Sequence, residues 1–525
     1  MPENAFAGAS SLATIAPASS PTYYGNFGNS AAATTTLETT EANAYVVHRG
    51  SNVTVRGLRV LVITNTRAAT SSVTTRLNGA DSSQTVSITA STTGTYIDTT
   101  NTVSVTAADT IGYKLVVGST SGNFYISSIS ANFESAGQAQ GVLSAVGGVS
   151  TTTASVSRFY VPTGNLATAQ STETNAQAAM PAPGTLSNLR IVVSAARATA
   201  TTFRTRINGA NGNQSVSITG TGVFEDTTNS DTVTVGLPVT ISTTTGTGVD
   251  TLTLVHASLL YTPSTAQMSP VLSGPASAVT LSSGVTRYYN PQGLLSAATS
   301  EPGSQQIAPV AGTISNFLID VASNGSISTT TWVFRVAGVD TALTFTVPAT
   351  STGVFSDTTH SATAAVGDLL SAKGSGGTTA NLSFRSMGFA ITAPNVYSMT
   401  AAASSFSLTG QNAGLLASLV MAAAAGSFAM TGQDVGLTYT SLVGYTITAG
   451  VGSFALSGQD AALKYGAVMS AGAASFSLTG QDVAFRAPLR LVADCGSFSM
   501  TGQAVNLTYS GGARARRFAV IIAGI

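Results

Sequence analysis

Two kinds of polar side chain recur three times along the chain at nearly constant spacing. Each recurring aspartate is followed by two threonines, and an arginine precedes it. These residues are Asp98, Asp226 and Asp357, and Arg76, Arg206 and Arg335. Carboxylate oxygens could bind Ca²⁺, but one carboxylate per repeat falls well short of the roughly six to eight oxygen ligands that Ca²⁺ takes. We therefore expect the aspartates to accept backbone N–H groups in turns between strands, with Ca²⁺ binding as the alternative.

Signatures of catalysis are missing from the sequence. Three histidines and one cysteine cannot form a zinc site with the usual spacing, and there is no H-E-x-x-H, G-x-S-x-G or Walker A motif. The stretch "KGSGG" at Lys373 has glycines without the phosphate-binding order. Acidic residues that could hydrolyse glycosides do not cluster. The sequence therefore predicts no enzyme, no cofactor and no metal site.

Charge is scarce in this sequence of 525 residues. Only 8% of the residues are charged, against roughly 25% in ordinary globular domains, and 21 basic residues balance 21 acidic ones. With so few charges, the surface would be covered by uncharged polar side chains or buried between subunits. We therefore expect a homo-oligomer, in particular a trimer. The zero net charge argues against a nucleic-acid partner. Neither a secretory signal nor an apolar stretch of about 18 residues is seen, so no membrane partner is expected.

A long repeat fills the first three quarters of the chain. The segments "RLNGADSSQTVSITA", "RINGANGNQSVSITG" and "RVAGVDTALTFTVPA" share one pattern, and their glycines Gly79, Gly209 and Gly338 are 130 and 129 residues apart. Apolar residues alternate with Ser and Thr at a period of two, as in Val86 and Ile88, which is typical of half-buried strands. About eight short strands in each repeat predict an antiparallel sandwich of the jelly-roll type.

Each long repeat has an aromatic pair near its start, which helps to place the domain boundaries. The pairs are Tyr23-Tyr24, Phe159-Tyr160 and Tyr288-Tyr289. We expect an all-β chain with three tandem antiparallel β-sandwich, jelly-roll-like domains followed by a β-hairpin repeat domain. The expected divisions are an N-terminal arm or anchor (1–22), three sandwiches (23–140, 141–267 and 268–393) and the hairpin repeats (394–525).

The last quarter repeats a shorter phrase, as in "GSFALSGQDAAL". Its phenylalanines, separated by 22, 26, 22 and 22 residues, are Phe406, Phe428, Phe454, Phe476 and Phe498. Its glutamines are Gln411, Gln433, Gln459, Gln481 and Gln503. Two alternating strands around a Gly-Gln turn predict a β-hairpin, and five hairpins would form one sheet within a chain or between chains. The glutamines are expected to bond to the local backbone at the turns, and a glutamine ladder is the alternative.

The apolar C-terminal stretch "FAVIIAGI" is expected to form a closing strand on the last repeat.

These repeats resemble those of structural proteins in tailed-bacteriophage virions. The likeness is carried by the "NGA…VSIT…DTTN" domains and the "GSFxLTGQDxxL" phrases, and it fits low-charge, Ser/Thr/Gly-rich decoration and appendage proteins. The resemblance implies a virion component, commonly trimeric, that contacts major capsid or tail proteins and in some cases a host surface glycan or protein. It also implies synthesis in a host cytoplasm and final location in the virion.

Two function classes therefore remain. The first is a non-enzymatic virion protein, which would decorate the capsid or form a fibre. The second is a bacterial surface adhesin or extracellular matrix protein, which would ordinarily need the secretion signal that we do not see.

Overall fold

The structure is a computed structural model of the chain, and it divides into two compact units, one of residues 2–393 and one of residues 394–525. In the first unit it describes residues 3–15, 22–25, 41, 45–48, 50–119, 121–135, 140–166, 169–247, 250–265, 267–274, 278–292, 297–377 and 381–393. In the second unit it describes the strands named below. For residues 3–15, 22–25 and most of the second unit, the description is limited to the backbone.

The first sandwich has two antiparallel sheets with the strand orders β1-β9-β4-β7 and β2-β8-β5-β6. Its strands are β1 (Glu3–Ile15), β2 (Thr22–Gly25), β4 (Val53–Asn65), β5 (Ser71–Leu77), β6 (Ala80–Ile88), β7 (Gly94–Val105), β8 (Thr110–Val116) and β9 (Phe124–Ser135). A short strand, β3 (Val46–Val47), also pairs with β8. Counted along the chain without β3, the sheet orders are 1-8-3-6 and 2-7-4-5, the order of a jelly roll.

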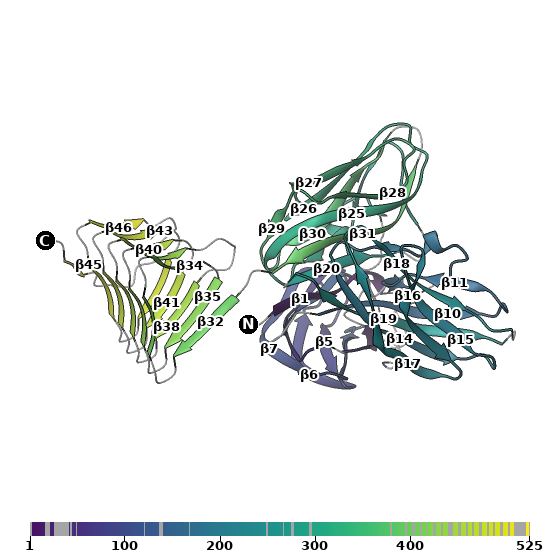
Figure 1. Ribbon diagram of the computed structural model, residues 1–525, viewed down its shortest axis with the longest axis horizontal. Coiled ribbons are helices and arrows are strands. Elements are labelled where there is room, and N and C mark those ends of the chain that lie inside the picture. The colour runs from purple at the N-terminus through teal and green to yellow at the C-terminus, as the bar shows by residue number, and fades with distance from the viewer. Residues whose placement is uncertain are drawn as a thin grey trace. The chain divides into compact units, whose positions relative to one another are not determined.

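The second and third sandwiches repeat this order. The second has the sheets β10-β19-β14-β17 and β11-β18-β15-β16, and the third has β20-β31-β25-β28 and β22-β30-β26-β27. The second is built from β10 (Gly141–Thr151), β11 (Ser157–Tyr160), β14 (Gly184–Ala195), β15 (Thr201–Ile207), β16 (Ala210–Ile218), β17 (Gly222–Val233), β18 (Pro238–Thr244) and β19 (Leu252–Pro263). The third is built from β20 (Met268–Ser273), β22 (Thr286–Tyr289), β25 (Gly312–Asn324), β26 (Thr330–Val336), β27 (Val339–Val347), β28 (Gly353–Asp357), β30 (Leu369–Ser375) and β31 (Leu382–Thr392). The predicted all-β class with tandem antiparallel sandwiches is confirmed (Figure 1).

Short strands extend the sheets of these two sandwiches. In the second they are β12 (Gly164–Asn165), which runs parallel to β10, and β13 (Ala178–Ala179), which pairs with β18. In the third they are β21 (Val279–Leu281), β23 (Ala297–Ala298), β24 (Gln306–Ile307) and β29 (Ala362–Ala364). Among them, β24 pairs with β30 in the same way as β13 pairs with β18 and β3 pairs with β8.

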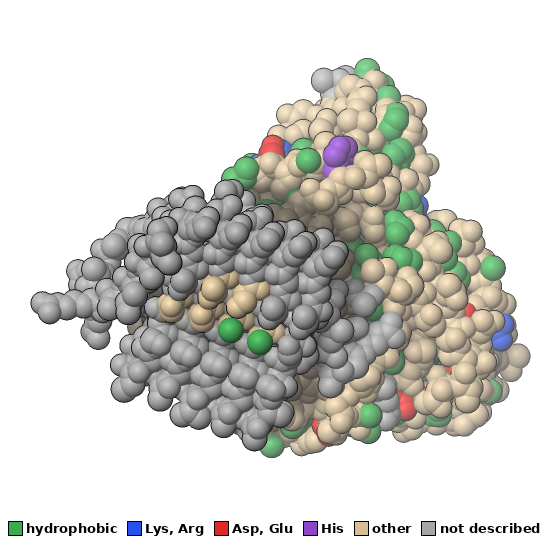
Figure 2. Space-filling view, turned by 60° about the vertical axis from the view of Figure 1, so that its left-hand side comes forward, with side chains coloured by type: hydrophobic (Ala, Val, Ile, Leu, Met, Phe, Trp, Pro, Cys, Tyr) green, Lys and Arg blue, Asp and Glu red, His purple; other side chains and the backbone are tan. Residues whose placement is uncertain are grey.

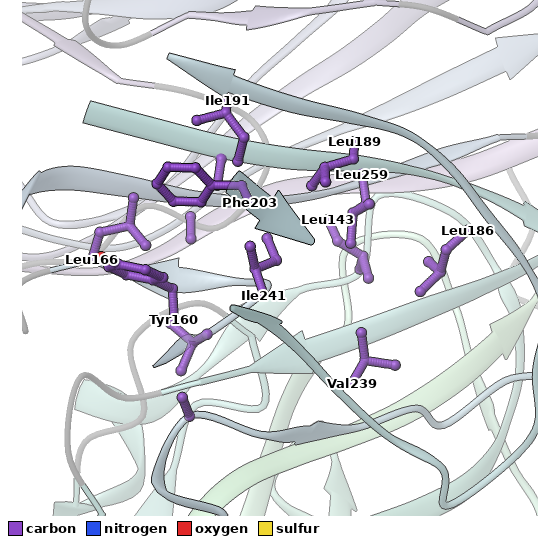
Figure 3. Packing of buried hydrophobic residues seen from close by; sticks show 14 of the residues in the cluster. Leu143, Tyr160, Leu166, Leu186, Leu189, Ile191, Phe203, Val239, Ile241 and Leu259 are labelled. Atoms are coloured by element: carbon purple, nitrogen blue, oxygen red, sulfur yellow. The ribbon is translucent and has the colours of Figure 1, made fainter. Parts of the chain in front are cut away.

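The cores form because alternate residues of each strand face inward. In β16, Gln214, Val216 and Ile218 are buried while the residues between them are partly or fully exposed. Figure 3 shows side chains from both sheets of the second sandwich meeting in its core, such as Phe203 from β15 and Ile191 from β14. Each sandwich thus encloses an apolar cluster of its own.

The tight turn between the fourth and fifth main strands of the second sandwich, β15 and β16, has the Asn-Gly sequence that is typical of a hairpin turn. Asn208 and Gly209 have φ of 50° and 77°, the left-handed values that a two-residue hairpin turn of type I′ requires. In the third sandwich the same turn has Ala337 at φ 50°, where a Cβ makes this conformation less favourable.

The expected N-terminal arm of residues 1–22 is corrected by the structure. Strand β1 pairs with β9 over most of its length, so it is the edge strand of the first sandwich. The corresponding first strands of the next sandwiches, β10 and β20, also precede the aromatic pairs. The aromatic pair therefore marks the second strand of each sandwich and not its beginning.

The second unit consists of three parallel sheets, and successive strands along the chain lie in different sheets. The first sheet contains β32 (Val396–Ala401), β35 (Ser418–Ala423), β38 (Tyr445–Ala449), β41 (Ala467–Ala471) and β44 (Leu489–Ala493). The second contains β33 (Ser405–Thr409), β36 (Ser427–Thr431), β39 (Ser453–Ser457), β42 (Ser475–Thr479), β45 (Ser497–Thr501) and β47 (Ile521–Ala523). The third contains β34 (Asn412–Leu416), β37 (Asp434–Thr438), β40 (Asp460–Lys464), β43 (Asp482–Arg486) and β46 (Ala504–Thr508).

This arrangement is a three-sided parallel β-helix, and it overturns the predicted hairpins. The two strands of each phrase, such as β39 and β40, belong to different sheets and pair only with strands of neighbouring repeats. Figure 1 shows these strands as rows of similarly directed arrows at the green-to-yellow end of the chain. Each repeat supplies three short strands, one more than the hairpin prediction assumed.

Candidate functional site

The recurring aspartates lie on the sixth main strand of each sandwich, β7, β17 and β28, and each accepts several hydrogen bonds. In the second sandwich, Asp226 Oδ2 accepts the amide of Ser215 at 2.8 Å, and Oδ1 accepts the amides of Thr228 at 3.1 Å and Asn229 at 3.0 Å. The Asn229 side chain donates to the same carboxylate. This buried carboxylate therefore ties β16 to β17 and holds the bend that follows it.

Asp98 and Asp357 make the same contacts in their own sandwiches. Asp98 accepts the amides of Thr85, Thr100 and Asn101, and Asp357 accepts those of Thr344, Thr359 and His360, all at 2.9–3.1 Å. Burial raises the pKa of each carboxyl, but the amide hydrogen bonds outweigh burial and hold the pKa below its usual value. The carboxylates are therefore ionised and engaged by backbone donors.

The recurring arginines each pair with a glutamate that sequence reasoning missed. Arg206 binds Glu173 through two parallel hydrogen bonds, Nε–Oε1 at 2.8 Å and Nη2–Oε2 at 2.7 Å. Arg76 makes the same paired contact with Glu41, and both distances are 2.7 Å. These charge-assisted hydrogen bonds raise the pKa of the Arg206 and Arg76 guanidinium groups above the usual value.

The third sandwich repeats this contact with Arg335 and Glu301. The distances are 2.9 Å from Nε to Oε1 and 3.2 Å from Nη2 to Oε2. Arg335 also contacts Asp340, which in turn contacts Lys373. The glutamate lies 33–35 residues before its arginine in all three sandwiches, on a short 3-10 segment, and the arginine lies on the fourth main strand. The ion pair therefore fastens this connection to the fourth main strand.

Hydrogen bonds also connect one sandwich to another, and one junction joins the third sandwich to the first. The backbone amide of Ile307 in β24 donates to Oγ of Ser128 in β9 at 3.2 Å. Oγ of Ser127 donates to the carbonyl oxygen of Gln305 at 2.9 Å. A register shift in β9 at this point leaves Ser127 as a bulge residue, which lets both serines contact the neighbouring sandwich. Both serine side chains are buried.

A second junction joins the second sandwich to the third. The backbone amide of Ala179 in β13 donates to Oγ of Ser386 in β31 at 3.2 Å, and both residues are fully buried. The apolar side chains of Leu272 and Ala390, from the third sandwich, belong to the core cluster of the second. The two sandwiches therefore share a continuous buried interface.

In the β-helix, the recurring phenylalanines occupy equivalent positions. Phe406, Phe428, Phe454, Phe476 and Phe498 follow one another in register along the second sheet. The recurring glutamines, Gln411, Gln433, Gln459, Gln481 and Gln503, lie outside the described residues. The extra four residues of the 26-residue repeat fall in the connection between β37 and β38.

The described surface has few charged side chains. Figure 2 shows one face on which uncharged polar side chains and backbone predominate and blue and red patches are sparse. Within the described parts of the chain, no group of three or more His, Cys, Asp or Glu side chains is placed to hold a metal ion. Among the same residues, no helix is long and apolar enough to span a membrane.

Comparisons with known proteins find only distant similarity. No family model matches the sequence, and no curated protein matches it. Two solved structures are similar over 66% of this chain and 84% of theirs. One, described as the triple jelly roll fold and turret assembly in an archaeal virus, is 13% identical with a TM-score of 0.13; the other, from the Sulfolobus Turreted Icosahedral Virus, is 14% identical with the same TM-score. The jelly-roll assignment therefore depends on this chain's own strand order.

Proposed function

We propose that this protein is a non-enzymatic structural component of a tailed-phage virion, either a capsid decoration protein or a fibre or appendage protein. One observation carries the proposal: the polar residues that recur in each sandwich are all engaged in holding strands and connections together. The aspartates accept backbone amides, and the arginines bind glutamates on the preceding connection. The recurring polar residues of the sandwiches therefore stabilise the fold.

The fold and the composition support the same proposal. Double-sheet jelly rolls are common in viral capsid domains, although lectins and cupins also use them. Short β-helix repeats stack into extended shafts, a shape that suits an appendage. With only 8% charged residues, much of the surface would suit contact with neighbouring proteins of a particle.

The partners in this proposal are major capsid or tail proteins and further copies of the chain, with a trimer as the expected oligomer. A host surface glycan or protein would be an additional partner if the chain lies at the end of a fibre. Light scattering at micromolar concentration tests the self-association, and a stable soluble monomer would remove that part of the proposal.

Particles purified from the native source test the proposed function. Antibodies against the chain, viewed by electron microscopy, should label particles at symmetric positions, and the chain should remain with particles through a density gradient. Labelling of the bacterial envelope, with particles unlabelled, would instead support the adhesin alternative. An antibody against a known particle protein serves as the positive control.

A further inference from the structure

Several arginines of this chain bind a carboxylate through the same edge of the guanidinium group. Arg76, Arg206 and Arg335 each present Nε and Nη2 to the two oxygens of a glutamate. Arg385 presents the same edge to Asp320, with 2.7 Å from Nε to Oδ2 and 3.0 Å from Nη2 to Oδ1. Because the N–H groups of Nε and Nη2 are parallel, this edge matches the two oxygens of a carboxylate or another oxyanion.

Arg197 of the second sandwich has this edge buried and without an acceptor. Neither Nε nor Nη2 has a hydrogen-bond partner, and both atoms are buried. The remaining nitrogen, Nη1, donates to the carbonyl oxygens of Thr151 and Thr153, at 3.3 Å in both cases. The residue as a whole is only 2% exposed. Nη1 therefore anchors the guanidinium group and leaves its paired edge unused.

The positive charge of Arg197 is also without a counter-charge. Oδ2 of Asp250 lies in the same region, because it accepts the backbone amide of Ala198 at 3.3 Å. Among the described residues, however, no carboxylate accepts a hydrogen bond from Arg197. A buried charge without a partner is unfavourable, and each buried N–H group without an acceptor adds to the cost. An anionic acceptor at this edge would therefore stabilise the folded chain.

The other two sandwiches differ at this position. Two residues after the third main strand, the first sandwich has Arg67 and the third has Ser326, where the second has Arg197. Nη1 of Arg67 donates to the carbonyl oxygen of Ser119. The hydroxyl of Ser326 donates to the carbonyl oxygen of Ser328 at 2.8 Å. The serine in the third sandwich shows that the jelly roll does not require an arginine here.

The place of Arg197 in the fold limits the size of a ligand. Arg197 lies on the short loop between β14 and β15, and the neighbouring Ala198 and Ala200 are exposed on this loop. The carbonyl groups that hold Nη1 belong to the last residue of β10 and to the connection after it. Surface loops move more readily than the strands that they join, so a small shift of this loop admits a small anion. A side chain of another protein would need a much larger opening.

We infer that the Nε–Nη2 edge of Arg197 is a binding site for a small oxyanion, such as phosphate or sulfate. The anion presents two oxygens to Nε and Nη2, as the glutamates and Asp320 do at the other arginines, while Nη1 keeps its two carbonyl contacts. The bound anion neutralises the guanidinium group and holds the β14–β15 loop against the end of β10. The inference does not depend on the proposed function.

Titration of the full chain with inorganic phosphate tests this site. Isothermal titration calorimetry in a chloride buffer of constant ionic strength should show one phosphate bound per chain, and sulfate should compete with it. Arg197→Ser, which introduces the residue type that the third sandwich has here, should weaken binding by about tenfold or more, because both donors are lost. Arg158→Ser is the matched control in the same sandwich, where Nη1 of Arg158 donates to the carbonyl of Ser157, and it should bind phosphate as the unaltered chain does.

Two further variants test the position of the anion and the geometry of the edge. Asp250→Asn leaves Arg197 intact and removes a negative charge beside Ala198, so phosphate should bind severalfold more tightly. Arg197→Lys keeps the positive charge but has no two-nitrogen edge, so it should bind phosphate more weakly than the unaltered chain. Circular dichroism establishes that each variant is folded.

The absence of saturable phosphate binding to the unaltered chain would overturn the inference. Equal phosphate affinity in the unaltered chain and in folded Arg197→Ser would overturn it as well. An internal ion pair is the third contrary result: Asp250→Asn would then lower the melting temperature in the absence of phosphate, and adding Arg197→Ser would lower it no further.

Discussion

The two units of this chain build repeats in opposite ways. In residues 2–393 each repeat is a jelly roll with antiparallel pairing that encloses its own apolar cluster. In residues 394–525 each repeat has only three short strands, and all of them pair in parallel with the neighbouring repeats. Contacts that stabilise a sandwich are therefore mostly internal, whereas contacts that stabilise the β-helix are mostly between repeats.

This difference indicates that the length of a repeat decides whether its stabilising contacts lie within the repeat or between neighbouring repeats. A repeat of about 130 residues is long enough to bury a core of its own, whereas one of 22 residues is not. Equivalent substitutions should thus have equal and local effects in the sandwiches, and effects that depend on position in the β-helix.

The largest expected effect is from truncating phenylalanines in the β-helix. The alternation of apolar and small residues in these strands predicts that the phenylalanines face the interior of the stack. Phe454→Ala should cost about 3–5 kcal/mol of unfolding free energy. Phe406→Ala should cost less, because an end repeat has one neighbour. Urea unfolding of all five variants measures this, and five small, equal losses would show that the repeats do not stack.

Truncating the recurring aspartates should produce the next largest effect. Asp98→Ala, Asp226→Ala and Asp357→Ala each leave partly buried backbone amides without an acceptor, so each should cost about 2–3 kcal/mol. The three losses should be similar, and hydrogen exchange should increase only in the altered sandwich. Asp250→Ala is the control, since this exposed carboxylate accepts a single amide at 3.3 Å. Exchange that spreads equally through all three sandwiches would contradict their independence.

Acid should weaken the sandwiches through the same three carboxylates. Their pKa values are lower in the folded chain than the usual value of about 3.9 in an unfolded chain. The stability that they contribute is therefore complete above about pH 4 and is lost as the pH falls towards the lowered pKa values. Thermal melts of residues 2–393 between pH 7 and pH 2 should show this loss. A variant with all three aspartates replaced by asparagine should melt lower at pH 7 and depend less on pH in this range.

The arginine–glutamate pairs should contribute less. A double-mutant cycle on Arg206 and Glu173, whose side chains are 20% and 15% exposed, should give a coupling of about 1 kcal/mol. This coupling is at the upper end of the range for surface ion pairs, because two parallel hydrogen bonds join the Arg206 guanidinium to the Glu173 carboxylate. Arg56 and Glu134 form the control pair, since the Arg56 side chain is 54% exposed and its coupling should be close to zero. Equal coupling for both pairs would show that geometry and burial do not matter here.

The smallest expected effect is a gain in stability, and it concerns a substitution in the β-helix. Asp434, Asp460 and Asp482 occupy adjacent register positions in β37, β40 and β43. Like charges on neighbouring strands repel, and stacked asparagines can bond along a ladder, so Asp460→Asn should stabilise this unit by about 0.2–1 kcal/mol. The gain should shrink in high salt, because salt screens the repulsion in the unaltered protein. A loss of stability would mean that these aspartates have favourable partners.

Much of the sandwich fold could be predicted from the sequence, and the pairing in the β-helix could not. Alternation in segments such as Gln84–Ile88 indicates strands, and turn residues separate them. The phrase "SFALS" also indicates a strand, but a period of two is the same in parallel and antiparallel sheets. A length of 22 residues also does not distinguish the two folds. It fits three short strands with the corners between them, and it fits a two-stranded hairpin with its turns. A sequence pattern of two strands and two turns therefore leaves no third strand in each repeat, where the structure has one such as Ala467–Ala471.

The candidate site was predictable only where its partners are local in sequence. The aspartates bond to amides of the turn that follows them, which the Asp-Thr-Thr pattern suggests. The glutamates that bind the arginines lie in short 3-10 segments of the connections, and only the recurrence of Glu41, Glu173 and Glu301 at a similar spacing could have indicated them. Ser128 and Ser386 resemble any other strand serines, so their contacts with neighbouring sandwiches required the three-dimensional arrangement.

A cryo-electron microscopy reconstruction of particles from the native source tests most directly the proposal that this chain is an architectural component of a virus particle. The account predicts density for three jelly rolls and a three-sided parallel β-helix, traceable to this sequence, at symmetry-related positions on the particle. Particles reconstructed to side-chain detail without this chain, together with its recovery only from the host cell envelope, would contradict the account.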